Sequence, residues 1–444
     1  TASNNTAVGY QSLKANTTGH SNVAVGMNAL RTTQTSAAQT AVGFNALAVA
    51  TGHYNTALGF YASGANTTGT ENVALGANAA ASNTSGALNV SVGSHAFLDN
   101  TTGSHNTSVG SYALSNNTTA SNNTAVGSSA LVANITGIRN TAVGAGTMPS
   151  NTTGSYNVGV GGPGSDNYNV LNNNISGGQL TAVGAGTLAR NTTGSDNTAF
   201  GAYALNLNTT AANNTAVGRS ALNANTTGNA NVAIGRDAGN AVTTGTSNVF
   251  VGYLAGVYST AVTTGSTNTL IGSYTSATTV DSVSAVGLGH SLAAATGYTT
   301  VGHGNSDIRA AHGTATWAAV SDQRYKKDIV DSTAGLSFIN ALQPRTFKYK
   351  TLGELPETFR AYEADSTEVF KNSDTNHGFI AQEVKAAIDA DNGLKDGFRL
   401  WAERDDGAQE VAEAALIPVL VKAIQEQQAL IEALTTRITT LEGE

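Results

Sequence analysis

The chain has 444 residues, a net charge of −8 and no cysteine. The acidic balance argues against a nucleic-acid-binding protein, which would carry a basic stripe, and the lack of cysteine excludes disulfides and thiolate metal sites. No run of about 18 apolar residues occurs, so the sequence predicts no membrane insertion by a helix.

Charge and glycine divide the chain near Ser321. Residues 1–320 hold seven basic and seven acidic residues and 43 of the 50 glycines. Residues 321–444 hold fourteen basic and twenty-two acidic residues. Two segments of such different chemistry predict two separate structures.

The first segment repeats Asn-Thr-Ala-Val-Gly, or a close variant, eighteen times at a spacing of 17 residues with few exceptions. The motif glycines are Gly9, Gly26, Gly43, Gly59, Gly76, Gly93, Gly110, Gly127, Gly144, Gly161, Gly184, Gly201, Gly218, Gly235, Gly252, Gly272, Gly287 and Gly302. Such a unit is too short for a helix pair and is rich in poor helix formers. The sequence therefore predicts a β-solenoid over residues 1–305, with two short strands in each coil.

Each coil offers two apolar positions for a core shared with its neighbours. We expect the large residue before each glycine to point inward, as at Val8, Leu58, Phe200 and Ile234. The Ala-Leu pair that follows, such as Ala113–Leu114, supplies the second inward group. Glycine permits a positive φ at the corner, and Asn-Thr-Thr-Gly predicts a turn with local side-chain hydrogen bonds. Since threonine clusters at turns, the sequence does not predict the flat threonine ranks of an ice-binding face.

The repeat Asn-Thr-Ala-Val-Gly-x-x-Ala-Leu is similar to the head repeats of trimeric autotransporter adhesins. Those repeats form left-handed parallel β-rolls that associate as trimers, and related repeats occur in phage fibres. The resemblance covers about residues 1–305 and implies a homotrimer. It leaves open a bacterial trimeric surface adhesin as the alternative to a phage fibre.

The second segment contains four motifs in order. They are Ser-Asp-Gln-Arg-Tyr-Lys-Lys-Asp-Ile (321–329), Leu-Gln-Pro-Arg-Thr-Phe-Lys-Tyr (342–349), His-Gly-Phe-Ile-Ala-Gln-Glu-Val (377–384) and Leu-Ile-Pro-Val-Leu (416–420). Together they resemble the intramolecular chaperone domain of phage tailspikes and endosialidases, the S74 peptidase family. The resemblance implies a connector at 306–320, a small α/β chaperone domain at 321–415, and a mainly β protein overall.

Residues 416–444 predict a coiled-coil helix. The seam consists of Ile417, Leu420, Ile424, Gln427, Ile431, Leu434, Ile438 and Leu441, at alternating spacings of three and four, and every member except Gln427 is apolar. The seam indicates self-association, and the alternative is an amphipathic helix packed on its own domain. Isoleucine at a with leucine at d is typical of dimers, so the expectation of a trimer depends on the family resemblance.

The resemblance also implies single-turnover autoproteolysis with no external substrate. Family members cleave themselves at the Ser-Asp junction after the shaft has folded, which makes Ser321 the nucleophile and Ser321–Asp322 the scissile bond. Lys326 would be the general base, because a serine hydroxyl needs an adjacent group to accept its proton. Arg324 and Asp322 would orient the site or hold the trimer. In isolation the same residues also fit a solvated linker.

The family motif has three supporting positions later in the chain, at Gly378, Gln382 and Glu383. No cofactor and no metal is expected, since the eight histidines are scattered without metal-ligand spacing. The chain is expected in the virion as a tail fibre or tailspike made in the host cytoplasm. Its expected partners are two further copies of itself, other tail proteins and a host receptor such as a glycan or an outer-membrane component, and not nucleic acid.

Overall fold

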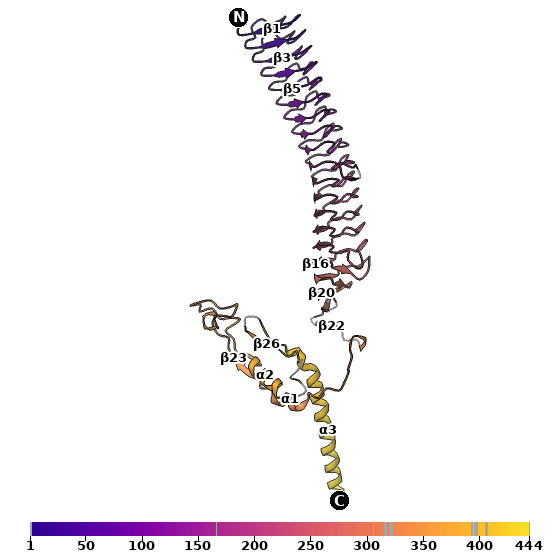
Figure 1. Ribbon diagram of the computed structural model, residues 1–444, viewed down its shortest axis with the longest axis vertical. Helices are drawn as coiled ribbons and strands as arrows, with labels where there is room; N and C mark the ends of the chain where they lie inside the picture. The colour runs from indigo at the N-terminus through magenta and orange to yellow at the C-terminus, as the bar shows by residue number, and fades with distance from the viewer. Residues whose placement is uncertain are drawn as a thin grey trace. The chain divides into compact units, whose positions relative to one another are not determined.

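The computed structural model describes residues 2–165, 167–304, 306–314, 318–319, 323–391, 394, 398–404 and 407–443 (Figure 1). The chain divides into two compact units, residues 1–320 and 321–444. The first unit is a β-solenoid, and the second contains short strands together with the helices α1, α2 and α3.

The solenoid stacks its coils through one parallel sheet, to which each coil contributes a three-residue strand. The strands are β1 (Thr6–Val8), β2 (Val23–Val25), β3 (Thr40–Val42), β4 (Thr56–Leu58), β5 (Val73–Leu75), β6 (Val90–Val92), β7 (Thr107–Val109), β8 (Thr124–Val126), β9 (Thr141–Val143), β10 (Val158–Val160), β11 (Thr181–Val183), β12 (Thr198–Phe200), β13 (Thr215–Val217), β14 (Val232–Ile234), β15 (Val249–Val251) and β16 (Thr269–Ile271). Neighbouring strands pair in register, so that equivalent residues of the repeat lie beside one another, as Val109 does with Val126. The β-solenoid predicted from the 17-residue period is therefore confirmed.

The second strand predicted in each coil is absent from most described coils. On that side the leucine of the Ala-Leu pair adopts a left-handed conformation, with φ of 49° at Leu114 and 51° at Leu131. Leu114 N–H still donates to the Ala130 carbonyl of the next coil at 3.0 Å, so the coils stay hydrogen-bonded there without an extended strand. This conformation favours leucine over valine or isoleucine, because β-branched side chains tolerate positive φ poorly.

The last coils depart from the regular repeat. They contain β17 (Ser276–Ala277), β18 (Val286–His290), β19 (Ala293–Ala294) and β20 (Tyr298–His303), followed by the antiparallel strands β21 (Ser306–Ala311) and β22 (Ala318–Ala319). Gly287, predicted as a corner glycine, pairs instead with Leu270 in the middle of a strand, and Gly289 takes the corner with a φ of 147°. Two glycines two residues apart fit the motif equally well, and only strand pairing distinguishes them.

The interior is filled by the middle residue of each strand and by the Ala-Leu pair, as with the fully buried Ala125, Ala130 and Leu131. The prediction that the residue before the corner glycine points inward is wrong. Val8, Leu58, Phe200 and Ile234 are between 43% and 57% exposed. Side chains alternate along a strand, and the coil is so narrow that a leucine from the opposite wall leaves room only for a small side chain at the middle position.

Phe250 shows how tightly the volume of the core is fixed. It occupies the middle position of β15, where most coils have alanine, and it is fully buried. Glycines 239 and 256 stand where most coils have the core leucine. A Cβ atom on Gly239 would lie 2.6 Å from the Phe250 ring, and one on Gly256 would lie 2.5 Å from it. A large residue on one wall is therefore matched by small ones on the other.

Two ladders of buried asparagines run along the solenoid. In the first, Asn117 Nδ2 donates to Asn100 Oδ1 and to the Ala120 carbonyl, both at 3.0 Å, and its own Oδ1 accepts from Asn134 at 3.0 Å. This ladder comprises Asn66, Asn83, Asn100, Asn117, Asn134, Asn151, Asn174, Asn191, Asn208 and Asn225. In the second, the asparagine that precedes most strands accepts a hydrogen bond from the backbone of the next coil, as when Asn123 N–H donates to Asn106 Oδ1 at 2.9 Å. The two asparagines of the repeat thus hydrogen-bond neighbouring coils to each other.

The two glycines of the repeat have different roles. Gly110, a corner glycine, has a φ of 132°, and a Cβ there would lie 2.5 Å from the backbone of Gly127. Gly103, the glycine of Asn-Thr-Thr-Gly, has no such backbone angle, although a Cβ there would lie 2.3 Å from the Ala120 carbonyl oxygen. Ala120 and Ala211 occupy its equivalent position in other coils, so this turn can hold a Cβ where the neighbouring coil is spaced for it. The corner position combines a close backbone contact with a positive φ.

The second unit is built around its helices and two antiparallel pairs of strands. Its elements are η1 (Gln323–Tyr325), α1 (Leu336–Ala341), β23 (Arg345–Phe347), η2 (Leu352–Glu354), β24 (Asn376–Gly378), α2 (Ala381–Ala390), β25 (Trp401–Glu403), β26 (Gln409–Val411), η3 (Glu413–Ala415) and α3 (Leu416–Glu442). The core comprises Ala334, Phe338, Val384, Ile388, Leu400, Leu416 and Val419. α1 packs against the start of α3, and Leu336 N–H donates to Glu426 Oε2 at 2.7 Å.

Candidate functional site

The predicted cleavage segment lies at the start of the second unit. Ser321 and Asp322 lie outside the described residues, so the distance from Ser321 to Lys326 stays untested. Arg324 lies in η1 with an exposed side chain, and Lys326 N–H donates to the Gln323 carbonyl at 2.9 Å. The Lys326 side chain is exposed in the single chain. A lysine acts as a base near neutral pH only when burial disfavours its charge, so this side chain would need further burial to serve as the predicted base.

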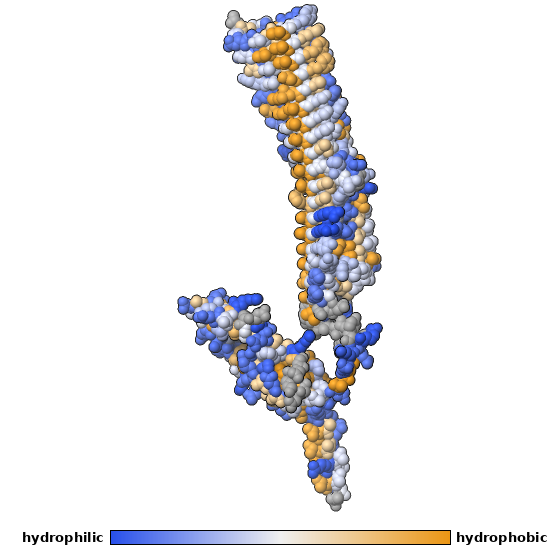
Figure 2. Space-filling model, in the orientation of Figure 1, coloured by the Kyte–Doolittle hydropathy of each residue, from blue (hydrophilic) through white to orange (hydrophobic). Residues whose placement is uncertain are grey.

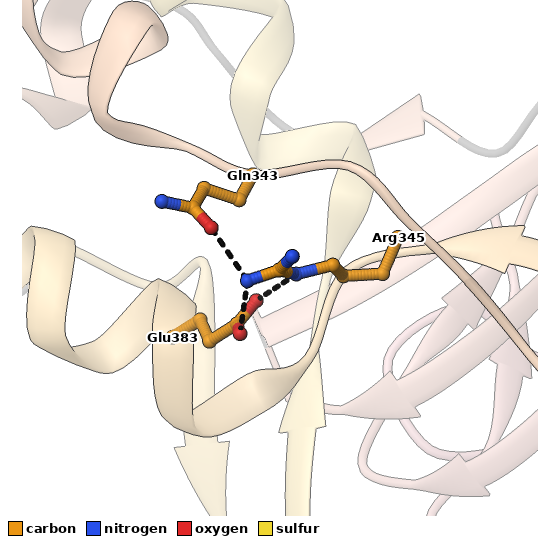
Figure 3. A network of polar contacts seen from close by, with 3 residues as sticks. All are labelled: Gln343, Arg345 and Glu383. Atoms are coloured by element: carbon orange, nitrogen blue, oxygen red, sulfur yellow. Dashed lines mark hydrogen bonds and ion pairs between the residues drawn. The ribbon is translucent and has the colours of Figure 1, made fainter.

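Two motif segments far apart in the sequence meet through an arginine–carboxylate fork (Figure 3). Antiparallel pairing of β23 with β24 places Arg345 opposite Gly378, and α2 begins soon after β24. Arg345 Nε donates to Glu383 Oε2 at 2.9 Å, and Nη2 donates to Glu383 Oε1 at 2.7 Å. Nη2 also donates to Gln343 Oε1. A bidentate pair of this kind fixes orientation as well as distance, so it locks β23 onto the first turn of α2.

The fork shifts the pKa values of its two charged members. The hydrogen bond from Arg345 lowers the pKa of the Glu383 carboxyl below its ordinary value, and the same bond raises the pKa of the Arg345 guanidinium. Both groups are part-exposed, so this is a positioning contact rather than a buried charge pair. Sequence reasoning identified Glu383 but gave Arg345 no role, although Arg345 lies within one of the family motifs.

The His377–Val384 motif also borders an open groove of about 1030 Å³ within the second unit. Gly378 and Gln382 line it, together with aromatic residues that include Phe347 and Trp401. Gln382 is exposed, whereas Glu383, one residue further on, turns toward Arg345. The motif therefore serves two surfaces, the fork on one side and the groove on the other.

The seam of α3 faces away from the rest of its own unit. The helix packs inward through Leu416, Val419 and Ala423. Its apolar seam residues, Ile417, Leu420, Ile424, Ile431, Leu434, Ile438 and Leu441, are between 42% and 70% exposed. Hydrophobic residues accordingly follow one side of α3 in Figure 2. The alternative of a helix that buries this seam on its own domain does not hold for the described chain.

The solenoid has a second unpartnered apolar surface, which we call the strand face. It consists of the first and third residues of β1–β16. Every first residue is threonine or valine and every third residue is valine, leucine, isoleucine or phenylalanine, so the strand face carries no charge. A hydrophobic band follows the solenoid in Figure 2. Threonine therefore does form an outward-facing row, contrary to the sequence expectation. Valine interrupts this row, and the residues in the third strand position differ in size, so the strand face is not a flat threonine array.

Most of the second unit matches a known protein family. The motifs at 321–329, 342–349 and 377–384 fall within one matched segment. Residues 321–393 match the Peptidase S74 family, described as the chaperone of endosialidase. The S74 segment contains η1, the fork and α2, and it ends before β25, β26 and α3. No curated protein and no solved structure matches the chain.

The S74 match and the solenoid together fit a tail fibre or tailspike. Among the described residues, no group of three or more histidine, aspartate or glutamate side chains is arranged to hold a metal ion. In the same part of the chain, every helix is too short or too polar to cross a membrane.

Proposed function

We propose that this chain is the shaft of a phage tail fibre or tailspike that attaches the virion to its host, with a C-terminal chaperone that assembles the shaft and then cleaves itself off. The S74 match favours this reading over a bacterial trimeric surface adhesin. The proposal includes a homotrimer, neighbouring tail proteins and a receptor on the host surface as partners.

The observation that carries the proposal is the exposed seam of α3. Seven apolar residues at heptad spacing are left in solvent by the single chain, and a parallel coiled coil would bury them. The start of the helix meanwhile packs on α1, so a bundle of these helices would bring the S74 segments of several copies together. The number three comes from the family resemblance.

The strand face supports association along the shaft as well. Sixteen strands spaced about 4.8 Å apart, with a width of about 10 Å, give the strand face an area of roughly 750 Å² per chain. This is close to the area that one partner buries in a standard protein–protein interface. A charge-free surface of this size is unusual on a monomer. We propose that the copies contact one another through it.

A chaperone at one end solves a problem that the repeat creates. Coils that are nearly identical can pair with the wrong coil of a neighbouring chain, since a slip of one whole repeat preserves most contacts. A C-terminal bundle that forms first would fix the register before the shaft closes. Pairing between segments far apart in sequence is slow to form, so a C-terminal bundle that starts assembly at one end would also speed folding of the shaft.

Cleavage is proposed at the Ser321–Asp322 bond, with Ser321 as nucleophile and Lys326 as the group that accepts its proton. Because Lys326 is exposed in the single chain, we propose that contact with other copies buries it. Cleavage would then follow assembly, and a chain that fails to associate would stay intact.

Two lysine substitutions on α3 test the proposal. Ile431→Lys places a charge in the seam, whereas Thr436→Lys places the same charge on the opposite side of the helix. We expect Ile431→Lys to give monomers or aggregates that are not cleaved, and Thr436→Lys to give cleaved trimers like the wild type. Light scattering measures the mass and a denaturing gel measures cleavage. Equal behaviour of the two variants would contradict the proposed bundle.

A further inference from the structure

Aromatic rings gather on one side of the last coils of the solenoid. The Tyr274 ring lies 5.2 Å from Tyr253, 4.9 Å from Tyr258 and 5.6 Å from His290, each time edge to face. His290 in turn stacks on His303 at 5.0 Å. At the other end, the Arg236 guanidinium lies over the Tyr253 ring at 5.5 Å. We call these residues the tyrosine patch: Arg236, Tyr253, Tyr258, Tyr274, His290 and His303.

The tyrosine patch includes a coil that departs from the regular repeat. Between Gly252 and Gly272 the coil is 20 residues long instead of 17, and the extra residues carry Tyr258, which is 54% exposed and contacts Tyr274. Tyr253, His290 and His303 directly follow corner glycines. Coils in the middle of the solenoid have alanine or serine at that position, as at Ala77, Ser94, Ser111, Ser128 and Ala145.

The chemistry of the tyrosine patch suits an amphipathic ligand that is both hydroxylated and ring-shaped. Exposed aromatic faces pack against C–H groups, while phenol, imidazole and guanidinium groups hydrogen-bond to hydroxyls. Arg236 also pairs with Asp237 at 3.0 Å, which presents a donor and an acceptor side by side. The strand face, by contrast, has no charge, which makes it the better candidate for contacts between copies.

We infer that the tyrosine patch is a saccharide-binding surface that recognises a polysaccharide of the bacterial surface. The patch spans five coils, or about 20 Å at 4.8 Å per coil, a length that accommodates several sugar residues of an extended chain. This inference rests on the proposed role of the chain as an attachment fibre, and it assigns the receptor surface within that role.

The test is binding of the assembled protein to an array that carries purified lipopolysaccharide O-chains and capsular polysaccharides as separate spots. We expect wild-type protein to bind saccharides of one class, and Tyr258→Ala and Tyr274→Ala to bind roughly five- to tenfold more weakly. Tyr112→Ala is the matched control, because Tyr112 and Tyr274 both lie two residues after a corner glycine, with φ of 57° and 58°. The control should bind like the wild type.

Wild-type protein that binds neither class would overturn the inference, as would equal binding by all three variants. Light scattering on the same samples separates this inference from the proposed function. Trimers that bind no saccharide would refute only the tyrosine patch. Monomers that still bind, with the loss confined to the two patch variants, would refute the proposed assembly and support the patch.

Discussion

The asparagine ladder predicts a large difference between two adjacent residues of the same type. Asn117 is fully buried and makes three hydrogen bonds, two as donor and one as acceptor. Asn116 is exposed. Asn117→Ala removes all three bonds, although Asn100 Oδ1 keeps the Gly103 N–H and the Ala120 carbonyl keeps Asn106 as partner. No polar atom is left wholly unpaired, so three net hydrogen bonds give a cost of about 2–4 kcal/mol.

Hydrogen exchange measured by mass spectrometry on the full chain is the suitable assay, because the stability of a solenoid is a sum over neighbouring coils and the damage should stay local. For Asn117→Ala we expect amides of β6, β7 and β8 to exchange faster by roughly one to three orders of magnitude, following the loss of opening free energy. Distant strands such as β14 should be unchanged. Asn116→Ala should exchange like the wild type, as exposed substitutions cost within about 0.5 kcal/mol. Similar protection in the two variants would show that the ladder does not hold the coils together.

The corner glycine, the packing of Phe250 and the Arg345–Glu383 fork can each be tested by substitution. Gly110→Ala should destabilise the solenoid by at least about 3 kcal/mol through its positive φ and its backbone contact. Gly103→Ala should cost less, because it meets a close contact with the Ala120 carbonyl oxygen but no positive φ, and the chain carries alanine at two equivalent positions. Denaturant midpoints compare the two variants, and equal costs would contradict the corner role. Phe250→Ala should lower the free energy of unfolding by about 3–5 kcal/mol, and adding Gly239→Leu should restore part of that loss. A double variant no more stable than Phe250→Ala alone would contradict the volume match between the two walls. The Glu383 carboxyl has a lowered pKa, so its ion pair with Arg345 stabilises the fold at pH values above the ordinary glutamate pKa of about 4.3. This stabilisation is lost as the pH falls through the lower pKa of the folded state. Glu383→Gln should lack this acid step in a circular dichroism titration, and a titration identical to that of the wild type would count against the fork.

The sequence was sufficient for the period of the solenoid, because strand pairing in register requires equivalent residues to recur at a fixed spacing. The sequence was misleading about which side chains of each strand point into the core. Large apolar residues were expected inside, but the leucine from the opposite wall already fills the coil, and the strand puts alanine inward and valine outward. Which strand position points inward depends on the volume of the side chains on the opposite wall of the coil, and the linear sequence does not show which residues face each other. The buried asparagines were likewise expected only as local turn residues, since their partners lie one coil away.

The candidate site was predictable to a similar extent. The order of the motifs identified the S74 segment, because several short matches in sequence order are unlikely to arise separately. The fork could not be found that way. Arg345 and Glu383 are 38 residues apart and meet only through the pairing of β23 with β24. The seam of α3 was visible as heptads, but whether it packs on its own unit depended on the competing face formed by Leu416, Val419 and Ala423.

We propose that the C-terminal unit assembles the shaft and then releases itself at one bond. Intact and native mass measurement of freshly folded wild-type protein, beside Ser321→Ala, tests this most directly. We expect wild-type protein to give a trimer of shaft chains ending at Ser321 and a separate fragment beginning at Asp322, while Ser321→Ala gives a full-length trimer. A wild-type protein that remains a full-length monomer after folding would contradict it.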